Sequence, residues 1–305
     1  MLSSLAIVLP VFGLIGVGYV AYRIRLVGDR TGDGLSDFVF SLAVPCLIFR
    51  TLVRAEIPEV QPWGYWISYF VGVAVVWALA MAIGRRFFGL SGTSAVVAGF
   101  SAGQANTVLV GIPMILKAYG DAGAVPLFLL IAVHLPVTMT LATLMAEGRK
   151  TSPWAILRRL AAHPIVIGIL AGSAFRPIAS HVPGPLWQVV DMIGTAAVPC
   201  ALIAMGIALR RYGLDAGWKL PTVISGLKLV VHPLIVLLLA TQVFEMPRAW
   251  AGVAVLFASC PCGINAYLFA ERYGEGVAIA SSAVALSTAF ALGTSLIWLQ
   301  VLGVG

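Results

Sequence analysis

Charged residues are scarce in this chain, and their scarcity sets the class of protein. They make up 10% of the 305 residues, whereas hydrophobic residues make up 60% and the mean hydropathy is +1.00. No stretch is both long enough and polar enough to form a soluble domain. The composition therefore predicts an all-α polytopic membrane protein surrounded by lipid. Loop charges explain the excess of Lys and Arg, so we expect no nucleic-acid partner.

Cysteine is also scarce, and its placement argues against two further classes. Cys46, Cys200, Cys260 and Cys262 all fall in apolar runs, so we expect no disulfide framework. Cys260 and Cys262 flank Pro261 in the form that copper-pumping ATPases use for Cu(I), an ion that thiolates suit. Such a pump needs large soluble nucleotide and phosphorylation domains, which this sequence lacks. We expect these residues to serve packing, with no bound metal or cofactor.

The chain is rich in apolar runs of roughly 20 residues, the length that crosses a membrane as a helix. Short charged loops separate them. The first run begins at about Ser3 with neither a basic n-region nor a small-residue cleavage site, so we expect it to be retained. The pattern predicts ten transmembrane spans, at 3–22, 34–53, 64–84, 92–117, 121–146, 163–180, 187–209, 219–241, 249–271 and 276–301.

The basic residues are distributed unevenly between the two sides of these spans. One side holds 13 of the 19 Lys and Arg residues, the other holds five, and Lys228 falls inside a span. Because cytoplasmic loops carry an excess of Lys and Arg, the first side is predicted to be cytoplasmic. Both termini would then lie outside a cell (inner) membrane, extracellular or periplasmic.

The sequence also repeats itself at an offset of 154 residues. This one offset places Pro10 on Pro164, Asp37 on Asp191, Val44-Pro45-Cys46 on Val198-Pro199-Cys200, and Tyr119-Gly120-Asp121 on Tyr273-Gly274-Glu275. The chain is thus predicted to consist of two five-span repeats, 1–146 and 163–305. Because five is odd, the second repeat enters the membrane inverted, which is an architecture of transporters.

The stretch Gly99–Gly120 lies in an apolar region and yet is unsuited to a continuous helix. Pro113 lacks a backbone donor and clashes with the preceding turn, so we expect the helix to break near Val110–Pro113. Irregular backbone at membrane depth is tolerated where it lines a cavity or is buried in protein. The stretch therefore indicates a binding site, to which it would contribute Gln104, Asn106, Thr107, Gly111 and Pro113. The alternative is a proline kink whose polar residues bond neighbouring helices.

The repeat partner of this stretch is Ser259–Gly274, which combines the helix breakers Pro261 and Gly263 with Asn265. Two broken spans that cross near the midplane would aim the positive ends of their half-helices at one point. Such a point suits a carboxylate. We expect Asn106 and Asn265 to bind it through their side-chain amides and the adjacent free backbone N–H groups.

These motifs resemble the auxin efflux carrier family over essentially the whole chain. The sequences ANTVLVGIPMILKAYG and PCGINAYLFAERYG resemble its fourth-span and ninth-span motifs, and FVFSLAVPCLIF is similar to its second span. The resemblance implies crossing spans 4 and 9 and an elevator-type secondary transporter. Spans 1, 2, 6 and 7 would form a scaffold, usually homodimeric, and spans 3–5 and 8–10 a moving transport domain. Short bacterial-looking members are associated with malonate, malate or other small organic acids, and plant members export auxin.

The chain departs from the plant carriers at two positions. Ala266 stands where they have the ninth-span crossover proline, so the break there must depend on Pro261 and Gly263. His134 stands where they have a glutamine in the fifth span. It either bonds a neighbouring helix or meets the substrate, and we favour the second role. Asp37 and Asp191 begin their spans, and their symmetry suggests a structural role in the scaffold.

Lys228 is the one basic residue that no loop accommodates. It lies nine residues beyond Lys219, so a helix carries it about 13–14 Å inward, close to the midplane. His232 follows on the same helical face. At the repeat offset, these two positions correspond to Ala74 and Ala78. We expect Lys228 to supply positive charge near the anion site, the alternative being a structural bond to a buried acid or carbonyl.

Three other functions remain open at this stage. An anion channel and a sodium-coupled carrier resembling the bile-acid symporters are compatible with inverted, broken spans. An intramembrane enzyme would need a catalytic motif, and none brings the histidines and serines together. As coupling ion we prefer H⁺, or uniport, over Na⁺. The predicted substrate-binding residues are Gln104, Asn106, Thr107, Gly111, Pro113, His134, Lys228, Pro261, Gly263 and Asn265.

The predicted orientation can be tested by labelling introduced cysteines. A cysteine near Ser3 should react with a membrane-impermeant maleimide from outside intact cells, because the positive-inside rule places that end outside. A cysteine near residue 154 should react only after permeabilisation. Labelling of the second site alone in intact cells would invert the topology.

Overall fold

The computed structural model describes residues 2–54, 63–148, 158, 164–213 and 215–304. These residues form helices joined by short turns, and among them the only β-pairing is one isolated bridge. The prediction of an all-α fold is confirmed. The segment 147–162, which joins the two predicted repeats and is predicted to be cytoplasmic, lies mostly outside the described residues.

The helices of the first half are interrupted twice by π-helical turns. In chain order the elements are α1 (Leu2–Arg23), α2 (Asp29–Phe38), the π turn η1 (Val39–Ala43), α3 (Val44–Arg54), α4 (Trp63–Phe88), α5 (Gly92–Gly103), the π turn η2 (Thr107–Gly111) and α6 (Ile112–Glu147).

The second half contains two further π turns within one long helical segment. Its elements are α8 (Pro164–Phe175), the 3₁₀ helix η4 (Arg176–His181), α9 (Gly184–Ala208), η5 (Leu209–Arg211), α10 (Lys219–Gly226), η6 (Leu227–Val231), α11 (His232–Leu238), η7 (Leu239–Val243), α12 (Arg248–Ala258), α13 (Ile264–Tyr273) and α14 (Val277–Val301).

Seven helical segments of the described residues are long and apolar enough to cross a membrane. They are Ser4–Arg23, Asp29–Arg54, Trp63–Phe88, Thr107–Glu147, Gly184–Arg211, Lys219–Val243 and Val277–Val301. The predicted spans 92–117 and 249–271 are each interrupted, and the predicted span 163–180 consists of the short α8 followed by η4. The chain is therefore an integral membrane protein in which several segments are not simple spanning helices.

Two glycines end helical segments at matching places in the two halves. Gly120 has φ +56° inside the long α6, and Gly274 has φ +67° after α13. A side chain is strained in this region of φ, whereas glycine adopts it readily. The two positions are 154 residues apart, so the sequence motif that they share marks an interruption of helix in both halves, although ψ differs, being −140° at Gly120 and 13° at Gly274.

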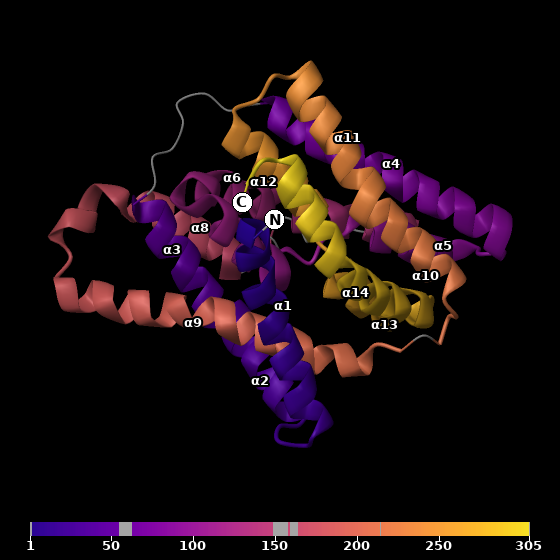
Figure 1. Cartoon of the computed structure of the whole chain (residues 1–305), viewed down its shortest axis with the longest axis horizontal. Coiled ribbons are helices and arrows are strands. Elements are labelled where there is room, and N and C mark those ends of the chain that lie inside the picture. The colour runs from indigo at the N-terminus through magenta and orange to yellow at the C-terminus, as the bar shows by residue number, and fades with distance from the viewer. Residues whose placement is uncertain (1, 55–62, 149–157, 159–163, 214, 305) are drawn as a thin grey trace.

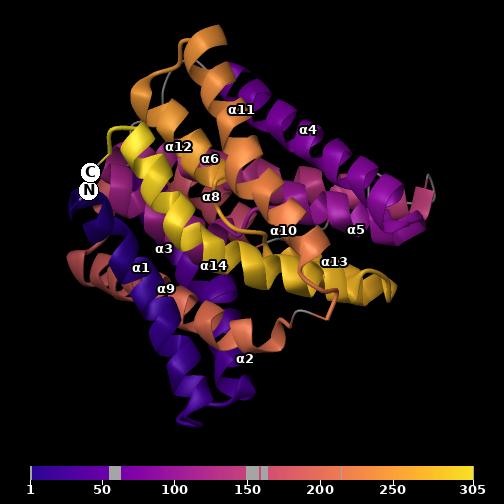
Figure 2. The same ribbon diagram turned by 45° about the vertical axis from the view of Figure 1, so that its right-hand side comes forward.

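The helices pack in two groups. In the first group, α9 packs on α1, α2 and α3, and α8 packs on α3. In the second group, α4 packs on α5 and α11, α12 on α6 and α11, and α14 on α10 and α13. Figures 1 and 2 show α1, α2 and α9 in the lower part of both views and α4 and α11 at the upper right. The start of α1 lies beside the end of α14 in both views, so both ends of the chain are on one face.

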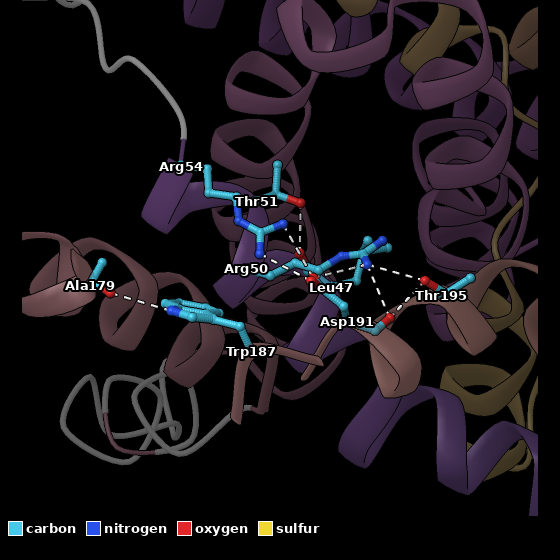
Figure 3. A network of polar contacts seen from close by, with 8 residues as sticks. All are labelled: Leu47, Arg50, Thr51, Arg54, Ala179, Trp187, Asp191 and Thr195. Atoms are coloured by element: carbon cyan, nitrogen blue, oxygen red, sulfur yellow. Dashed lines mark hydrogen bonds and ion pairs between the residues drawn. The ribbon is translucent and has the colours of Figure 1, made fainter. Parts of the chain in front are cut away.

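Ion pairs fasten α9 to the helices that cross it, at both ends of α9. Asp191 receives two hydrogen bonds from Arg54, 3.2 Å to Oδ1 and 3.1 Å to Oδ2, and lies 3.4 Å from Arg50 (Figure 3). Just beyond the other end of α9, Arg211 pairs with Asp33 at 2.7 Å and with Asp29 at 3.5 Å. Asp191 thus has the structural role expected of it, whereas its repeat partner Asp37 is exposed.

Close backbone contact also joins α1 to α9. A Cβ atom on Gly18 would lie 2.3 Å from the carbonyl oxygen of Ile203, and one on Gly206 would lie 2.0 Å from that of Ile15. The two helices therefore approach each other closely through glycines, as membrane helices do when small residues line their interface.

We predict that Gly18→Ala destabilises the protein. The added methyl group collides with backbone, which has little freedom to move, and overpacking of this kind costs about 1–3 kcal/mol. Gly16→Ala, in the same helix, is the matched control because nothing lies within 4 Å of the position that its added methyl group would take. Thermal unfolding in detergent should show a lower Tm for Gly18→Ala alone. An equal Tm for the two variants would contradict the close packing.

Candidate substrate-binding site

The first helix break lies upstream of the predicted one. Helix α5 ends at Gly103, Gln104 is extended, and helical backbone resumes at Thr107. The expectation of a break near Val110–Pro113 is therefore wrong. Pro113 lies in the first turn of α6, directly after the π turn η2, so helical backbone runs through it from Thr107 onward. The wide π turn η2 leads into this proline.

The second break lies where the sequence predicts it. Helix α12 ends at Ala258, Gly263 is extended with φ −76° and ψ 144°, and α13 begins at Ile264. Pro261 and Gly263 thus fall inside the break, and the absence of a proline at Ala266 does not shift it. Residues 104–106 and 259–263 are called the two breaks below.

The two breaks pair with each other as a short antiparallel bridge. Asn106 N–H donates to the carbonyl of Pro261 at 2.8 Å, and Gly263 N–H donates to the carbonyl of Gln104 at 3.0 Å. A Cβ atom on Gly263 would lie 2.9 Å from the carbonyl oxygen of Ala105, so the close approach requires glycine. Backbone groups that would otherwise be unpaired in an apolar interior are satisfied in this way.

Side chains from two other helices satisfy the N–H groups at the centre of the bridge. Ala105 N–H donates to His134 Nε2 at 3.3 Å, from α6, and Cys262 N–H donates to Ser287 Oγ at 2.9 Å, from α14. Because Nε2 of His134 is the acceptor, the neutral ring carries its proton on Nδ1 and donates to Tyr69 Oη at 3.0 Å. His134 therefore bonds neighbouring segments of protein.

The last four carbonyl groups of α12 are also satisfied. They accept hydrogen bonds from the backbone N–H groups of Ser259 and Cys260, from the side chains of these residues, and from Lys228, whose Nζ lies 2.5 Å from the carbonyl oxygen of Ala258. The end of a helix carries about half a negative charge, which favours an ammonium group there. Lys228 is fully buried, and its Nζ lies 3.3 Å from His232 Nδ1.

A cavity of about 730 Å³ opens beside the paired breaks, between the two groups of helices. The first group contributes residues of α2, η1, α8 and α9, and the second contributes the first break, α6 and α13. Most of the lining is apolar. Its polar side chains are Asp33, Ser36, Asp37, Ser41, Gln104, Asn106, Thr107, Thr140, Thr143, Arg211, Asn265 and Arg272.

Four of the ten predicted site residues line this cavity together: Gln104, Asn106, Thr107 and Asn265. The other six lie behind the lining among the described residues. Gly111 and Pro113 are buried in the first turns after the first break, Pro261 and Gly263 form the second break, and His134 and Lys228 bond the backbone next to the breaks. Three residues at the site, Ser287, Arg211 and Arg272, were not predicted. A serine within a span, or an arginine at the end of one, gives no distinctive signal in a membrane-protein sequence.

The two polar side chains of the first break have different partners. Thr138 Oγ1 donates to Gln104 Oε1 at 2.7 Å, which fixes the glutamine amide. Asn106 Nδ2 donates to the thioether sulfur of Met205 at 3.2 Å. A thioether is a weak acceptor, so this amide remains available to a stronger one.

The charged residues of the cavity, Asp33, Asp37, Arg211 and Arg272, are exposed, whereas Gln104 and Asn106 are buried. Arg211 follows α9, Arg272 lies near the end of α13, and Asp33 lies in the first turns of α2. In the predicted topology these three helix ends fall on the same, basic side. The cavity thus extends from the paired breaks, deep in the protein, to these exposed residues.

An integral membrane protein with a cavity leading to broken helices has the features of a membrane transporter. Comparison with protein families agrees. A family described as "Membrane transport protein" matches residues 4–299, and the chain belongs to this family, which is that of the auxin efflux carriers. The predicted family resemblance is confirmed, and the protein is a transporter and not an enzyme.

Three relatives illustrate the range of the family. A Rhizobium meliloti protein named "Putative malonate transporter" is 31% identical over 303 residues, which are 94% of this chain and 92% of that protein. An uncharacterized transporter of Methanothermobacter thermautotrophicus is 24% identical over 99% of both chains. The mouse lysosomal cholesterol signaling protein is 23% identical over 92% of this chain and 35% of its own length.

We predict that Ser287→Ala destabilises the paired breaks. The change leaves Cys262 N–H without an acceptor, and a stranded buried donor costs about 1–3 kcal/mol. Ser295→Ala is the matched control on the same helix, because Ser295 Oγ is buried and unbonded among the described residues. Thermal unfolding of both variants should separate them. The same Tm for the two would argue against the role of Ser287.

Proposed function

We propose that this protein is a secondary transporter that moves a small organic anion through the cavity at the paired breaks. The observation that carries the proposal is the convergence of Asn106 and Asn265, one from each broken span, on that cavity. A carboxylate accepts hydrogen bonds only, and side-chain amides can donate two each. The two asparagines therefore match the substrate chemically.

Two helix beginnings add to this anion-binding character. Helical backbone starts at Thr107 after the first break and at Ile264 after the second, and residues of both first turns line the cavity. The first N–H groups of a helix have no acceptor within that helix, and the helix dipole makes this end positive. Anions bind readily at such ends. An arriving carboxylate would also displace only the weak thioether contact of Asn106.

The substrate we favour is a mono- or dicarboxylate such as malonate or an auxin-like acid. The 31% identical relative from Rhizobium meliloti is named for malonate, and the cavity is large enough for a small acid. Arg211 and Arg272 lie toward the mouth of the cavity together with Asp33 and Asp37, so their positive charge is balanced there. Asp33 pairs with Arg211 and lowers the net charge at this entrance.

We further propose ten spans in two inverted repeats of five, with an elevator-type movement. Shifted by 154 residues, α4 would cover 217–242, and the segment from α10 to η7 covers 219–243. Both ends of the chain lie on one face, which fits an even number of crossings. The first group of helices would be the scaffold and the second the transport domain. The cavity between them would open to the cytoplasm in this conformation.

Coupling and assembly complete the proposal. Bringing one negative charge inward against 100 mV, inside negative, costs about 2.3 kcal/mol. Export can therefore run as uniport, whereas accumulation inside needs a cation, for which we propose H⁺. We also propose a homodimer that contacts through scaffold helices. Light scattering of the purified protein would test it, and a monomeric mass would exclude it.

Asn106→Ala should weaken malonate binding by about 1–3 kcal/mol, because the bound carboxylate loses a buried donor. Asn265→Ala should have a similar effect. Ser41→Ala is the control, since Ser41 lines the cavity from the opposite group of helices. Titration of labelled malonate onto each purified variant gives the affinities. Wild-type affinity in a folded Asn106→Ala protein would contradict the assignment.

Counterflow in proteoliposomes separates a carrier from a channel. Unlabelled malonate trapped inside should accelerate the entry of labelled malonate, because an alternating-access site returns faster when it is loaded. A channel shows no such acceleration. Flux of malonate without counterflow would therefore show that the protein is an anion channel and not a carrier.

A further inference from the structure

Lys228 is a buried basic residue, and no full negative charge within the described ranges lies next to its ammonium group. Its side chain is fully buried in η6, and none of the ion pairs formed by the described residues includes it. Its ammonium is bonded to the Ala258 carbonyl and to His232 Nδ1, both of which are neutral groups. The helix end supplies about half a negative charge. A full positive charge here therefore lacks a full negative partner in the empty protein.

The missing charge can come from the substrate. Ala258 directly precedes the second break, and the second break is bonded to Asn106 through the carbonyl of Pro261. Lys228 thus lies behind the same pair of breaks whose other side faces the cavity. An anion bound by Asn106 and Asn265 would face the ammonium across the bridge, where the low dielectric makes their attraction strong.

We propose that Lys228 carries the proton that is transported together with the anion. The inference rests on the proposed function. With substrate bound, the amine takes up one proton, a new N–H bond forms, and the ammonium balances one negative charge. When the substrate leaves, the proton leaves too, and the empty carrier returns with a neutral amine. The empty carrier therefore does not have to move an unpaired ammonium charge through the apolar interior.

The groups around Lys228 offer a route for that proton. His232 Nδ1 is in contact with Nζ, and the ring of His232 lies 5.2 Å from that of Tyr69 in α4. Tyr69 is bonded to His134 of α6, which is bonded to the cavity-lining residue Ala105. Nε2 of His232 is buried and has no partner among the described residues. The thiols of Cys260 and Cys262 also belong to this buried cluster, which contains no carboxylate in the described part of the chain.

The π turn that carries Lys228 supports a functional role. Residues Leu227–Val231 form η6, and Pro233 follows in the first turn of α11. π turns are rare and occur frequently at functional sites. The two residues that replace Lys228 and His232 in the first repeat are alanines, so neither is required by the repeated fold.

The test is accumulation of labelled malonate in proteoliposomes at zero voltage, with a gradient of one pH unit, acid outside. One proton per malonate gives about tenfold accumulation in the wild type. Lys228→Gln should abolish accumulation but retain counterflow exchange. Lys228→Arg keeps the charge and the bond to Ala258, but a guanidinium does not release its proton. It should therefore exchange malonate without net accumulation. Ser295→Ala is the control and should still accumulate about tenfold, because Ser295 Oγ is buried and unbonded among the described residues and belongs neither to the site nor to the proton route.

The outcomes separate this inference from the proposed function. Tenfold accumulation by Lys228→Gln or by Lys228→Arg would overturn the role of Lys228. So would wild-type counterflow without any accumulation. Absence of counterflow in the wild type would instead contradict transport of malonate itself. If Lys228→Gln fails to fold, the folded Lys228→Arg protein decides between the outcomes.

Discussion

Irregular backbone inside an apolar protein must have every polar group bonded, and this constraint explains much of the interior. Water is not available there to satisfy a stray N–H or carbonyl group, and each unsatisfied group costs several kcal/mol. The two breaks satisfy this constraint first by forming hydrogen bonds to each other. The N–H groups at the centre of the bridge then need acceptors, which His134 and Ser287 provide. The free carbonyl of Ala258 needs a donor, which Lys228 provides.

This arrangement divides the polar residues into two sets with different tasks. His134, Ser287 and Lys228 lie behind the breaks and hold their backbone, whereas Gln104, Asn106 and Asn265 face the cavity. The first set makes the second possible, because a side chain can recognise a carboxylate only where its own backbone is fixed. A change behind the breaks should therefore alter the site without touching the ligand.

The sequence predicts the membrane class, the family and most helices, because apolar length and a repeated motif are strong signals. It predicts the second break correctly, since Pro261 and Gly263 lie inside it. The first break is misplaced because Pro113 is read as a breaker, although a π turn directly precedes it and helical backbone runs through it. Lys228 stands out from the sequence as a buried charge. Its partner, Ala258, does not, because any residue has a carbonyl group and only the folded chain brings this one within reach.

The strength of the contacts differs within and between the two groups of helices, and this difference bears on movement. Within the first group, Arg50, Arg54 and Asp191 bind through charged, directional bonds, and glycines bring α1 against α9. Between the groups, Asn106 bonds Met205 through a thioether, a weak acceptor, and the cavity walls are mainly apolar. Apolar surfaces slide with little change in energy, whereas ion pairs resist displacement. This distribution of contacts supports the proposal that the first group of helices stays rigid while the second moves.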